Sequence, residues 1–354
     1  MRFGLLLGVL SPLALFGACA HHARDIASIP GWIVIAHRSA SGYLPEHTLV
    51  GVAMAAGWGV DFVEPDVVLT RDSIPVVLHD IQLETSTDVA KKFPFRNRAD
   101  GHYYVSDFRL KEIKLLHVME RGKDDKPDEA AFPNRFPRTL NRSSFEIPTF
   151  EEYLEFVEGI RHSTHRVLGV FPEIKHSEIY AKSGQDIVKI VYEMLARFGY
   201  EKKPNLAFIQ SFNPKDLQRL KNEMETKIPL VQLIGKNSWK ESSADYDTMI
   251  TPEGLRAISR YAATVSPSLD QLFSFDAASK HLIVNSFVAD AHAAGLKVVP
   301  YTHRQDPLPA PFKDNDQFFS VLKNEAHIDG LFSDFADEVL IWEGRLKRSK
   351  DSIF

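Results

Sequence analysis

The sequence of 354 residues contains a single cysteine, Cys19, so no disulfide can form within it. It also lacks an excess of basic residues, since 42 lysines and arginines face 47 aspartates and glutamates. The resulting net charge of −5 argues against a nucleic-acid partner, which needs a basic face. We find no internal repeat and no low-complexity tract. A chain of this length, 44% hydrophobic, can instead be held together by its core.

Apart from its N-terminus, the chain has no long apolar run. Residues 3–16 are mostly apolar, follow Met1 and Arg2, and lead into small residues. This pattern is typical of a secretory signal peptide, which we assign to residues 1–20. The run is short for a membrane-spanning helix, which needs about 20 residues.

Two cleavage patterns compete at the end of this segment. Ala18-Cys19-Ala20 fits a signal-peptidase site, whereas residues 16–19 resemble a bacterial lipobox in which Phe16 replaces the usual leucine. We favour the lipobox, because the one cysteine of the chain lies where a lipidated cysteine would. The sequence therefore predicts an exported protein, in the periplasm or on the outer membrane or cell surface, attached to a membrane through Cys19.

From residue 31 to residue 345, apolar or β-branched runs alternate with helical patterns. The runs lie at residues 32–36, 62–69, 167–173, 206–212, 230–234, 263–265, 297–301 and 330–333. Eight strands, nearly all followed by a helix, predict an α/β protein with a closed (β/α)8 TIM barrel. An open doubly wound sheet is the alternative. It is disfavoured because residues 37–42, after the first strand, lack the glycine-rich dinucleotide fingerprint.

Three carboxylates occur in or at the ends of these runs. Glu64 and Asp66 are two positions apart and point to the same side of a strand, and Glu173 ends the next run. Acids that face a barrel interior are costly unless a cation pairs with them. Oxygen ligands without a thiolate or a clear histidine predict calcium or magnesium rather than zinc. The alternatives are a solvated strand face and a buried ion pair between Glu173 and Lys175.

Several segments, taken in order, resemble one enzyme family. They are residues 37–48 (HRSASGYLPEHT), 64–66 (EPD), 78–80 (LHD), 173–175 (EIK), 208–212 (FIQSF), 299–302 (VPYT) and 329–335 (DGLFSDF). Together they are similar to the glycerophosphodiester phosphodiesterases of the exported bacterial type, over about residues 32–342. One departure is Ser39, where the family usually has a glycine, a residue that tolerates positive φ.

The resemblance implies a role for each matching residue. The catalytic histidines fall on His37 and His79, the metal-binding acids on Glu64, Asp66 and Glu173, and the substrate-binding groups on Arg38, Glu46 and Lys175. Gln210, Phe212 and Tyr301, at strand ends that face the same mouth, are expected to shape the glycerol pocket. His47 receives no role.

The implied reaction is hydrolysis of a small-molecule glycerophosphodiester, such as glycerophosphocholine or glycerophosphoethanolamine, to sn-glycerol 3-phosphate and an alcohol, with calcium or else magnesium as cofactor. One histidine takes a proton from the nucleophile, either water or the glycerol C2 hydroxyl, and the other protonates the leaving alcohol. Two alternatives are a phospholipase D-like enzyme on the same fold and a surface-exposed binding lipoprotein. The first usually has disulfides and lacks an insertion like the one that follows.

Residues 81–147 do not fit the strand–helix alternation. They are polar, aromatic and proline-bearing, and they are too many for a barrel loop. We predict an inserted subdomain that covers the C-terminal mouth of the barrel. Its aromatic residues include Phe93, Phe95, Tyr103 and Tyr104, which could close over a ligand. We expect the insertion to affect which head groups are accepted without supplying the chemistry; the alternative is a stabilising cap.

Overall fold

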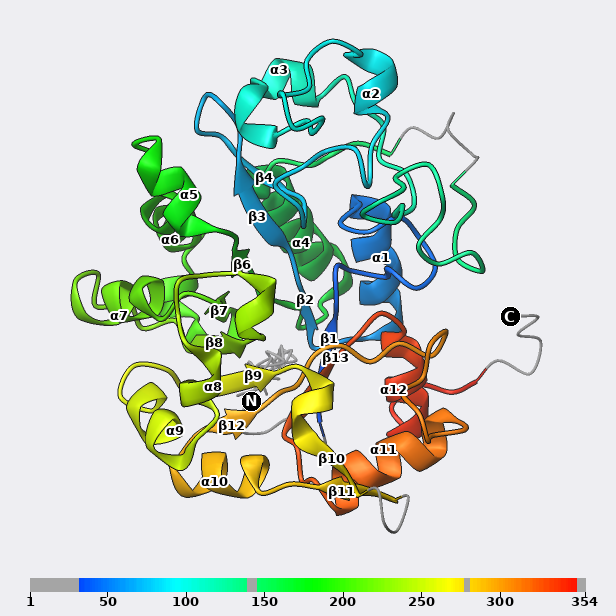
Figure 1. Ribbon diagram of the computed structural model, residues 1–354, viewed down its shortest axis with the longest axis vertical. Coiled ribbons are helices and arrows are strands. Elements are labelled where there is room, and N and C mark those ends of the chain that lie inside the picture. Colours follow the sequence, from blue (N-terminus) through cyan, green and yellow to red (C-terminus); the bar gives the residue numbers. More distant parts are fainter. Residues whose placement is uncertain (1–31, 139–144, 277–280, 349–354) are drawn as a thin grey trace, which may run out of the picture.

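The computed structural model describes residues 32–138, 145–276 and 281–348, and a ring of parallel strands forms its centre (Figure 1). In chain order the eight ring positions are β1 (Ile33–Ala36), β2 with β3 (Phe62–Val63 and Asp66–Leu69), β5 with β6 (Gly169–Val170 and Glu173–Ile174), β7 (Ile209–Ser211), β8 (Leu230–Ile234), β9 (Thr264–Pro267), β12 (Lys297–Val298) and β13 (Gly330–Ser333). The ladders run β13-β1-β2-β5 and β12-β9-β8-β7-β6-β3. Backbone hydrogen bonds from Asp329 N to Val298 O and from Phe332 N to Pro300 O close the ring. The predicted (β/α)8 barrel is confirmed.

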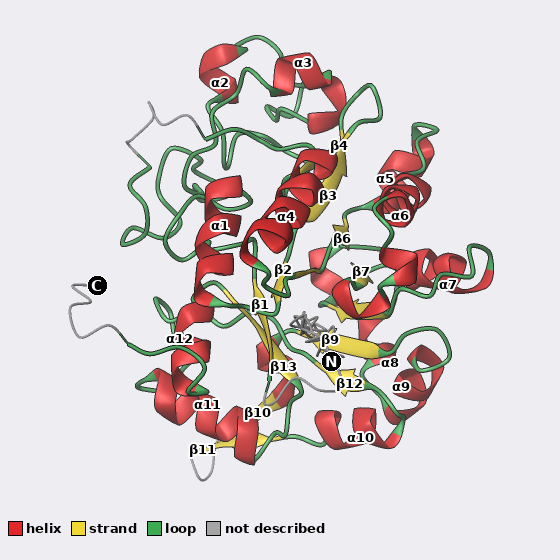
Figure 2. Ribbon diagram, turned by 180° about the vertical axis from the view of Figure 1, so that it is seen from behind, coloured by secondary structure: helices red, strands yellow, loops and turns green. Residues whose placement is uncertain are grey.

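Helices surround the barrel (Figure 2). They are α1 (Leu49–Trp58), α4 (Phe150–Thr164), α5 (Ser177–Lys182), α6 (Ile187–Arg197), α7 (Pro214–Asn222), α8 (Tyr246–Met249), α9 (Pro252–Ile258), α10 (Phe287–Ala293), α11 (Asn315–Asn324) and α12 (Ala336–Trp342). Two antiparallel additions are β4 (Pro75–Val77), which pairs with β3, and the hairpin of β10 (Phe273–Asp276) and β11 (His281–Val284). Among the described residues, no helix combines the length and apolarity that a membrane crossing requires. The predicted signal peptide and Cys19 lie outside the described residues.

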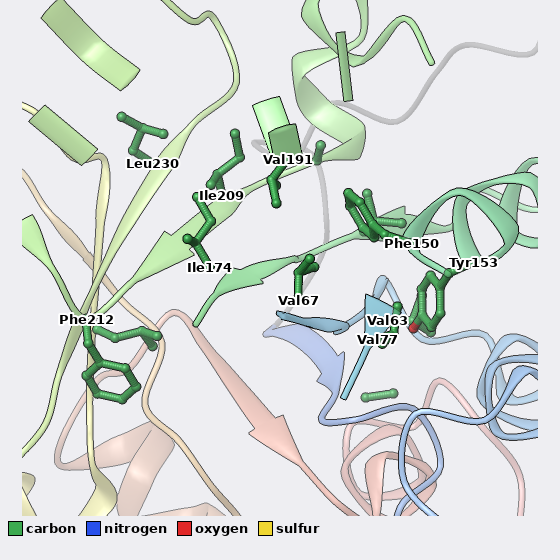
Figure 3. Packing of buried hydrophobic residues seen from close by; sticks show 14 of the residues in the cluster. Val63, Val67, Val77, Phe150, Tyr153, Ile174, Val191, Ile209, Phe212 and Leu230 are labelled. Atoms are coloured by element: carbon green, nitrogen blue, oxygen red, sulfur yellow. The ribbon is translucent and has the colours of Figure 1, made fainter. Parts of the chain in front are cut away.

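Side chains of the barrel strands alternate between two buried cores. Val34 and Ala36 of β1 face outward and join the core between strands and helices, whereas Ile33 and Ile35 face inward. Figure 3 shows part of the outer core, where strand and helix residues pack together. The inner core is a layer of eight residues: Ile33, Ile35, Phe62, Phe171, Phe208, Val231, Val299 and Phe332. This apolar layer fills the barrel and forms a floor beneath its carboxyl-terminal mouth.

The described residues of the segment 81–147 follow β4, and its helices lie at the top of Figure 1, next to β3 and β4. Its described residues include two short helices, α2 (Val89–Lys92) and α3 (Leu110–Ile113). Val89, Phe108 and Ile113 are fully buried and belong to the same outer core as the barrel helices. The insertion is therefore packed firmly against the barrel.

Candidate active site

A polar layer lies directly above the apolar floor. Two residues beyond six of the eight inner-core residues, the strands carry His37, Glu64, Glu173, Gln210, Tyr301 and Asp334. The two-residue period of a strand brings these side chains to the inside of the barrel at its carboxyl end. All except Asp334 line one cavity of about 480 Å³, together with Arg38, His79, Lys175 and Phe212.

Of the three predicted metal-binding acids, Glu64 and Glu173 line this cavity, and Asp66 is buried beside them. Strand register pairs Asp66 of β3 with Glu173 of β6, and each of the three acids is at most 6% exposed. One carboxylate oxygen of Glu64 accepts a hydrogen bond from the Arg38 backbone N–H at 2.8 Å. The other accepts from Gln210 Nε2 at 3.1 Å. These contacts hold Glu64 beside the other two acids.

The electrostatics of the three acids fit a hard divalent cation. Burial, followed by the charges of Asp66 and Glu173, raises the pKa of Glu64 well above its usual value. Burial also raises the pKa of Glu173, although Lys175 lies 2.7 Å from its carboxylate. Among the described residues, Oδ1 of Asp66 is buried without a hydrogen-bond partner. Carboxylate oxygens that are crowded, buried and incompletely paired are the ligands that calcium and magnesium take.

His47 is the residue that the sequence analysis missed here. It is buried, and its Nε2 donates to Oδ2 of Asp66 at 2.8 Å. Ligand atoms of His47, Glu64 and Asp66 lie within 4.8 Å of one another. A histidine that donates to a metal-binding carboxylate fixes its orientation. Its place in the segment 37–48, next to Glu46, was the signal that could have identified it.

His37 is held by an aspartate from the last barrel strand. Its Nδ1 donates to Oδ1 of Asp334 at 2.6 Å. Burial acts to raise the pKa of Asp334, but Arg304, His37 and Arg135 hold it well below its usual value. Burial lowers the pKa of His37 to about 4, although Asp334 opposes this shift. The imidazole is therefore neutral at pH 7 with its proton on Nδ1, which leaves Nε2 as a base.

His79 has a parallel arrangement. Its Nδ1 is hydrogen-bonded to Oδ1 of Asp80. The other Asp80 oxygen accepts from Thr85 Oγ1 at 2.5 Å and from Arg121 Nη1 at 2.9 Å. Burial, then the charges of Arg38 and Lys175, lowers the pKa of His79 to about 3. The cavity thus has two neutral histidines, each held through Nδ1 by a carboxylate.

Two arginines bind Glu46 beside the His79–Asp80 pair. Arg38 Nη1 donates to Glu46 Oε2 at 2.9 Å. Arg121 binds both oxygens of the same carboxylate, at 3.0 and 2.7 Å, and its Nη2 lies 3.4 Å from His79 Nδ1. Burial acts to raise the pKa of Glu46, but Arg121 and Arg38 lower it, so Glu46 is ionised. Glu46 therefore positions the two guanidinium groups.

The opposite wall of the cavity is partly aromatic. Lys175 Nζ lies 5.7 Å above the ring centroid of Phe212, and the rings of Phe212 and Tyr301 meet edge to face at 5.9 Å. The Tyr301 hydroxyl donates to the Ile234 carbonyl at 2.9 Å, which fixes the ring. Lys175 remains cationic, because Glu173 and Glu241 raise its pKa against the opposing effect of burial. The ion pair of Glu173 and Lys175, which was the alternative to a metal site, is present. Glu173 also lies beside Asp66 in the acidic cluster, so the ion pair does not exclude a metal ion there.

Residues 37–338 match the model of the glycerophosphoryl diester phosphodiesterase family. The chain belongs to this family. A glycerophosphodiester phosphodiesterase of Haemophilus influenzae is 38% identical to it, over 94% of this chain and 96% of that protein. A glycerophosphodiester phosphodiesterase of Treponema pallidum is 31% identical, over 86% of this chain and 90% of that protein. The family inferred from the motifs is therefore confirmed, whereas its exported type stays a prediction. The chain spans nearly the full length of both relatives.

Solved structures with lower sequence identity share the fold. The structure of a glycerophosphoryl diester phosphodiesterase from Silicibacter pomeroyi has a TM-score of 0.66 at 20% identity, covering 90% of this chain and 96% of that one. That of an Oleispira antarctica phosphodiesterase, in complex with its product sn-glycerol-3-phosphate, has a TM-score of 0.58 at 22% identity, covering 89% and 97%. At these identities the likeness supports the barrel architecture alone.

The serine that replaces the usual family glycine adopts the backbone conformation that favours glycine. Ser39 has a φ of 73°, and Arg38 before it has a φ of 52°. Positive φ is unfavourable for a residue with a Cβ atom, so the loop must be held by other contacts. Ser39 Oγ and the Tyr153 hydroxyl are 3.2 Å apart in a buried hydrogen bond. The departure from the family pattern thus leaves the turn intact.

The insertion reaches the active site through other residues than the aromatic ones that the sequence analysis named. The four aromatic residues Phe93, Phe95, Tyr103 and Tyr104 do not line the cavity. Phe95 is 93% exposed, and Phe93 packs on Phe108 inside the insertion. The insertion instead brings Arg121 to His79 and Arg135 to Asp334. In this family member the insertion therefore places a charged group beside each histidine–aspartate pair, which the sequence analysis did not predict. That the insertion affects which head groups are accepted stays a prediction.

Proposed function

We propose that this family member is a metal-dependent phosphodiesterase that hydrolyses glycerophosphodiesters to sn-glycerol 3-phosphate and an alcohol. The observation that carries the proposal is the pair of neutral histidines beside a buried carboxylate cluster in one cavity. Both relatives named above are called glycerophosphodiester phosphodiesterases, and the Oleispira neighbour was solved with sn-glycerol-3-phosphate bound.

The histidines provide the proton transfers. With Nδ1 hydrogen-bonded to Asp334 or Asp80, each imidazole has Nε2 left for the substrate. One histidine takes the proton of the attacking hydroxyl as its oxygen bonds to phosphorus. The other must first take up a proton on Nε2, as the anionic diester binds beside it, and then gives that proton to the alcohol oxygen as the second phosphorus–oxygen bond breaks. Each transfer contributes about 10²–10⁴-fold to the rate.

Cationic side chains bind the phosphate. Arg38 and Lys175 line the cavity from two sides, with Glu46 and Glu173 as their partners. A guanidinium matches two phosphate oxygens, and an ammonium adds a point charge. We propose Glu64, Asp66 and Glu173 as ligands of calcium, with magnesium as the alternative. When bound, such an ion neutralises charge on the phosphate oxygens.

A coupled assay tests the proposed function. The purified protein is stripped with EDTA, reloaded with calcium or magnesium, and given glycerophosphocholine or glycerophosphoethanolamine. Released sn-glycerol 3-phosphate is measured through a dehydrogenase that is assayed separately for metal dependence. We expect product with calcium and none after stripping. Hydrolysis of an intact choline lysolipid without hydrolysis of either soluble diester would instead favour the phospholipase D-like alternative.

Export and lipidation at Cys19 are a second part of the proposal. The support is the apolar segment before Cys19 and the small residues around it. Expression of wild type and Cys19→Ser in a bacterial host, followed by fatty-acid labelling and membrane fractionation, tests it. We expect wild type to be labelled and membrane-bound and the variant to be unlabelled. An unlabelled wild type that is cleaved after Ala20 would contradict lipidation and leave export in place.

A further inference from the structure

A second cavity opens on the other side of the two histidines. Its volume is about 380 Å³, and it shares His37, Arg38, His79 and Arg304 with the first cavity. The remaining wall comes largely from the insertion, through Arg121, Gly122, Lys123, Asp124, Ala131, Phe132 and Arg135. None of these seven residues lines the first cavity. A diester held at the histidines therefore has room for one substituent on each side of its phosphorus.

The two cavities differ in what they offer a ligand. The first is lined by Glu64, Glu173, Gln210 and Lys175. These groups match the phosphate and the hydroxyls of glycerol 3-phosphate, which is the half that all glycerophosphodiesters share. The variable alcohol then lies in the second cavity. We propose that this cavity binds the departing alcohol and prefers polyols, such as glycerol or inositol, to alcohols with a quaternary ammonium group. This inference rests on the proposed function.

The preference follows from groups that are already occupied. A quaternary ammonium ion needs a free aromatic face or an unpaired carboxylate. Phe132 is the aromatic residue of this wall, and the guanidinium of Arg135 lies 3.7 Å above its ring centroid. Both oxygens of Glu46 accept hydrogen bonds from arginines, and one oxygen of Asp334 accepts from Arg135 while the other accepts from His37. Asp124 also lines the cavity, 3.8 Å from Arg121. The wall nevertheless has five arginine or lysine side chains against three carboxylates, so its net charge is positive.

Hydrogen-bond donors remain for an oxygen-rich ligand. The Lys123 side chain is 47% exposed and forms an ion pair with Glu129 at 2.7 Å. Arg304 contacts Asp334 through Nε at 2.9 Å, so its two terminal nitrogens extend beyond that contact. Ammonium and guanidinium groups donate to hydroxyl and phosphate oxygens and repel a fixed positive charge. The cavity therefore suits a polyol and disfavours choline.

Kinetics with three diesters tests this preference. The calcium-loaded enzyme is given glycerophosphoglycerol, glycerophosphoinositol and glycerophosphocholine, and sn-glycerol 3-phosphate release yields kcat/KM for each. We expect both polyol diesters to exceed glycerophosphocholine by at least about fivefold, the scale of one partly exposed charge interaction. Hydrolysis of any of the three supports the proposed function. Equal kcat/KM values, or a preference for choline, would overturn the inference alone.

Two charge reversals locate the effect. Lys123→Glu places a carboxylate in the cavity wall, whereas Lys126→Glu places one beside the same Glu129 outside the cavity. We expect Lys123→Glu to move the choline-to-glycerol ratio of kcat/KM about fivefold toward choline and Lys126→Glu to leave it unchanged. Lys123→Gln, which avoids repulsion by Glu129, should give a smaller shift in the same direction. Equal effects of the two reversals would contradict the assignment of Lys123 to this subsite.

Discussion

Arg135 of the insertion and Asp334 of the barrel form a buried ion pair, with Nη2 and Oδ2 2.8 Å apart. The other oxygen of Asp334 accepts from His37. The position of a catalytic histidine thus depends on a segment outside the barrel. Arg121 has the matching place on the other side, where it contacts Asp80 and, through it, His79. The insertion and the barrel therefore build the site together.

Asp334→Asn should lower kcat about 10²-fold or more, because a neutral amide no longer fixes the Nδ1–H tautomer of His37 or stabilises its cation. The matched control is Asp306→Asn, since Asp306 also pairs with Arg135, at 2.6 Å, but does not touch His37. Steady-state kinetics should give near-normal KM for both variants and a loss of kcat only for Asp334→Asn. Equal kcat values would show that Asp334 has no positioning role.

Arg121→Met should lower kcat/KM about 10–10²-fold, because it leaves Glu46 with Arg38 alone and removes the arginine that pairs with Asp80 beside His79. Arg98→Met is the control: Arg98 also pairs with an aspartate, Asp107, but lies on the exposed side of the insertion. Kinetics and thermal unfolding of both variants are the measurements. A loss of activity in Arg121→Met that only follows a loss of folded protein would contradict a direct role in the site.

Deletion of residues 88–145 should abolish turnover. The deletion removes Arg121 and Arg135 together and exposes the outer core that Val89 and Phe108 help to fill. From the sequence alone, which predicted an insertion that does not supply the chemistry, some activity would be expected to remain. Activity on glycerophosphoglycerol, measured on truncated protein that circular dichroism finds folded, is the test. Turnover near wild type would mean that the barrel alone positions both histidines.

Calcium affinity should rise with pH. The pKa values of Glu64 and Glu173 are raised, so the metal-free protein holds protons there that calcium must displace. The dissociation constant should fall as pH rises through these pKa values, by up to about tenfold per pH unit for each proton displaced, and then level off. Calorimetric titrations in buffers of different ionisation enthalpy measure both affinity and proton release.

The same shifts determine the stability of the metal-free protein. A carboxyl whose pKa is raised in the folded state binds its proton more tightly there than in the unfolded chain. The free energy of unfolding should therefore fall as pH rises above the ordinary glutamate pKa of about 4.5, and excess calcium should reverse the loss. Glu64→Gln should weaken calcium binding about tenfold or more. The control Glu120→Gln removes a buried carboxyl whose pKa is also raised, to about 8, and should leave calcium affinity unchanged. Similar losses in both variants would contradict the ligand assignment.

The sequence predicted those features that depend on local pattern. The alternation of apolar runs and helices predicted all eight barrel strands, and the i, i+2 spacing of Glu64 and Asp66 predicted that they share a face. Pairings between distant segments were not predictable in this way. Asp334 is 297 positions from His37, and Arg135 is 199 positions from Asp334. Such pairs arise only when the closed barrel and the insertion bring the segments together.

The place of the aromatic residues Phe93 and Tyr103 of the insertion was also not predictable from local pattern. An aromatic residue in a polar segment can line a ligand site or fill a small local core. The second holds for Phe93, which packs on Phe108, and for Tyr103, which is buried and donates to the Pro94 carbonyl at 3.2 Å. Composition does not distinguish these outcomes. Likewise, nothing in the sequence distinguishes Arg121 and Arg135 from surface arginines. Their contacts with Asp80 and Asp334 in the structure do.

The most direct test of the account is turnover by His37→Ala and His79→Ala, each loaded with calcium and compared with wild type and with His102→Ala. His102 also pairs with a carboxylate, Glu84, but lies in the insertion away from the cavity. Release of sn-glycerol 3-phosphate from glycerophosphoglycerol should fall at least about 10²-fold in the two site variants, with unchanged calcium affinity, and stay normal in His102→Ala. Near-normal turnover in either His37→Ala or His79→Ala would contradict the proposed proton transfers.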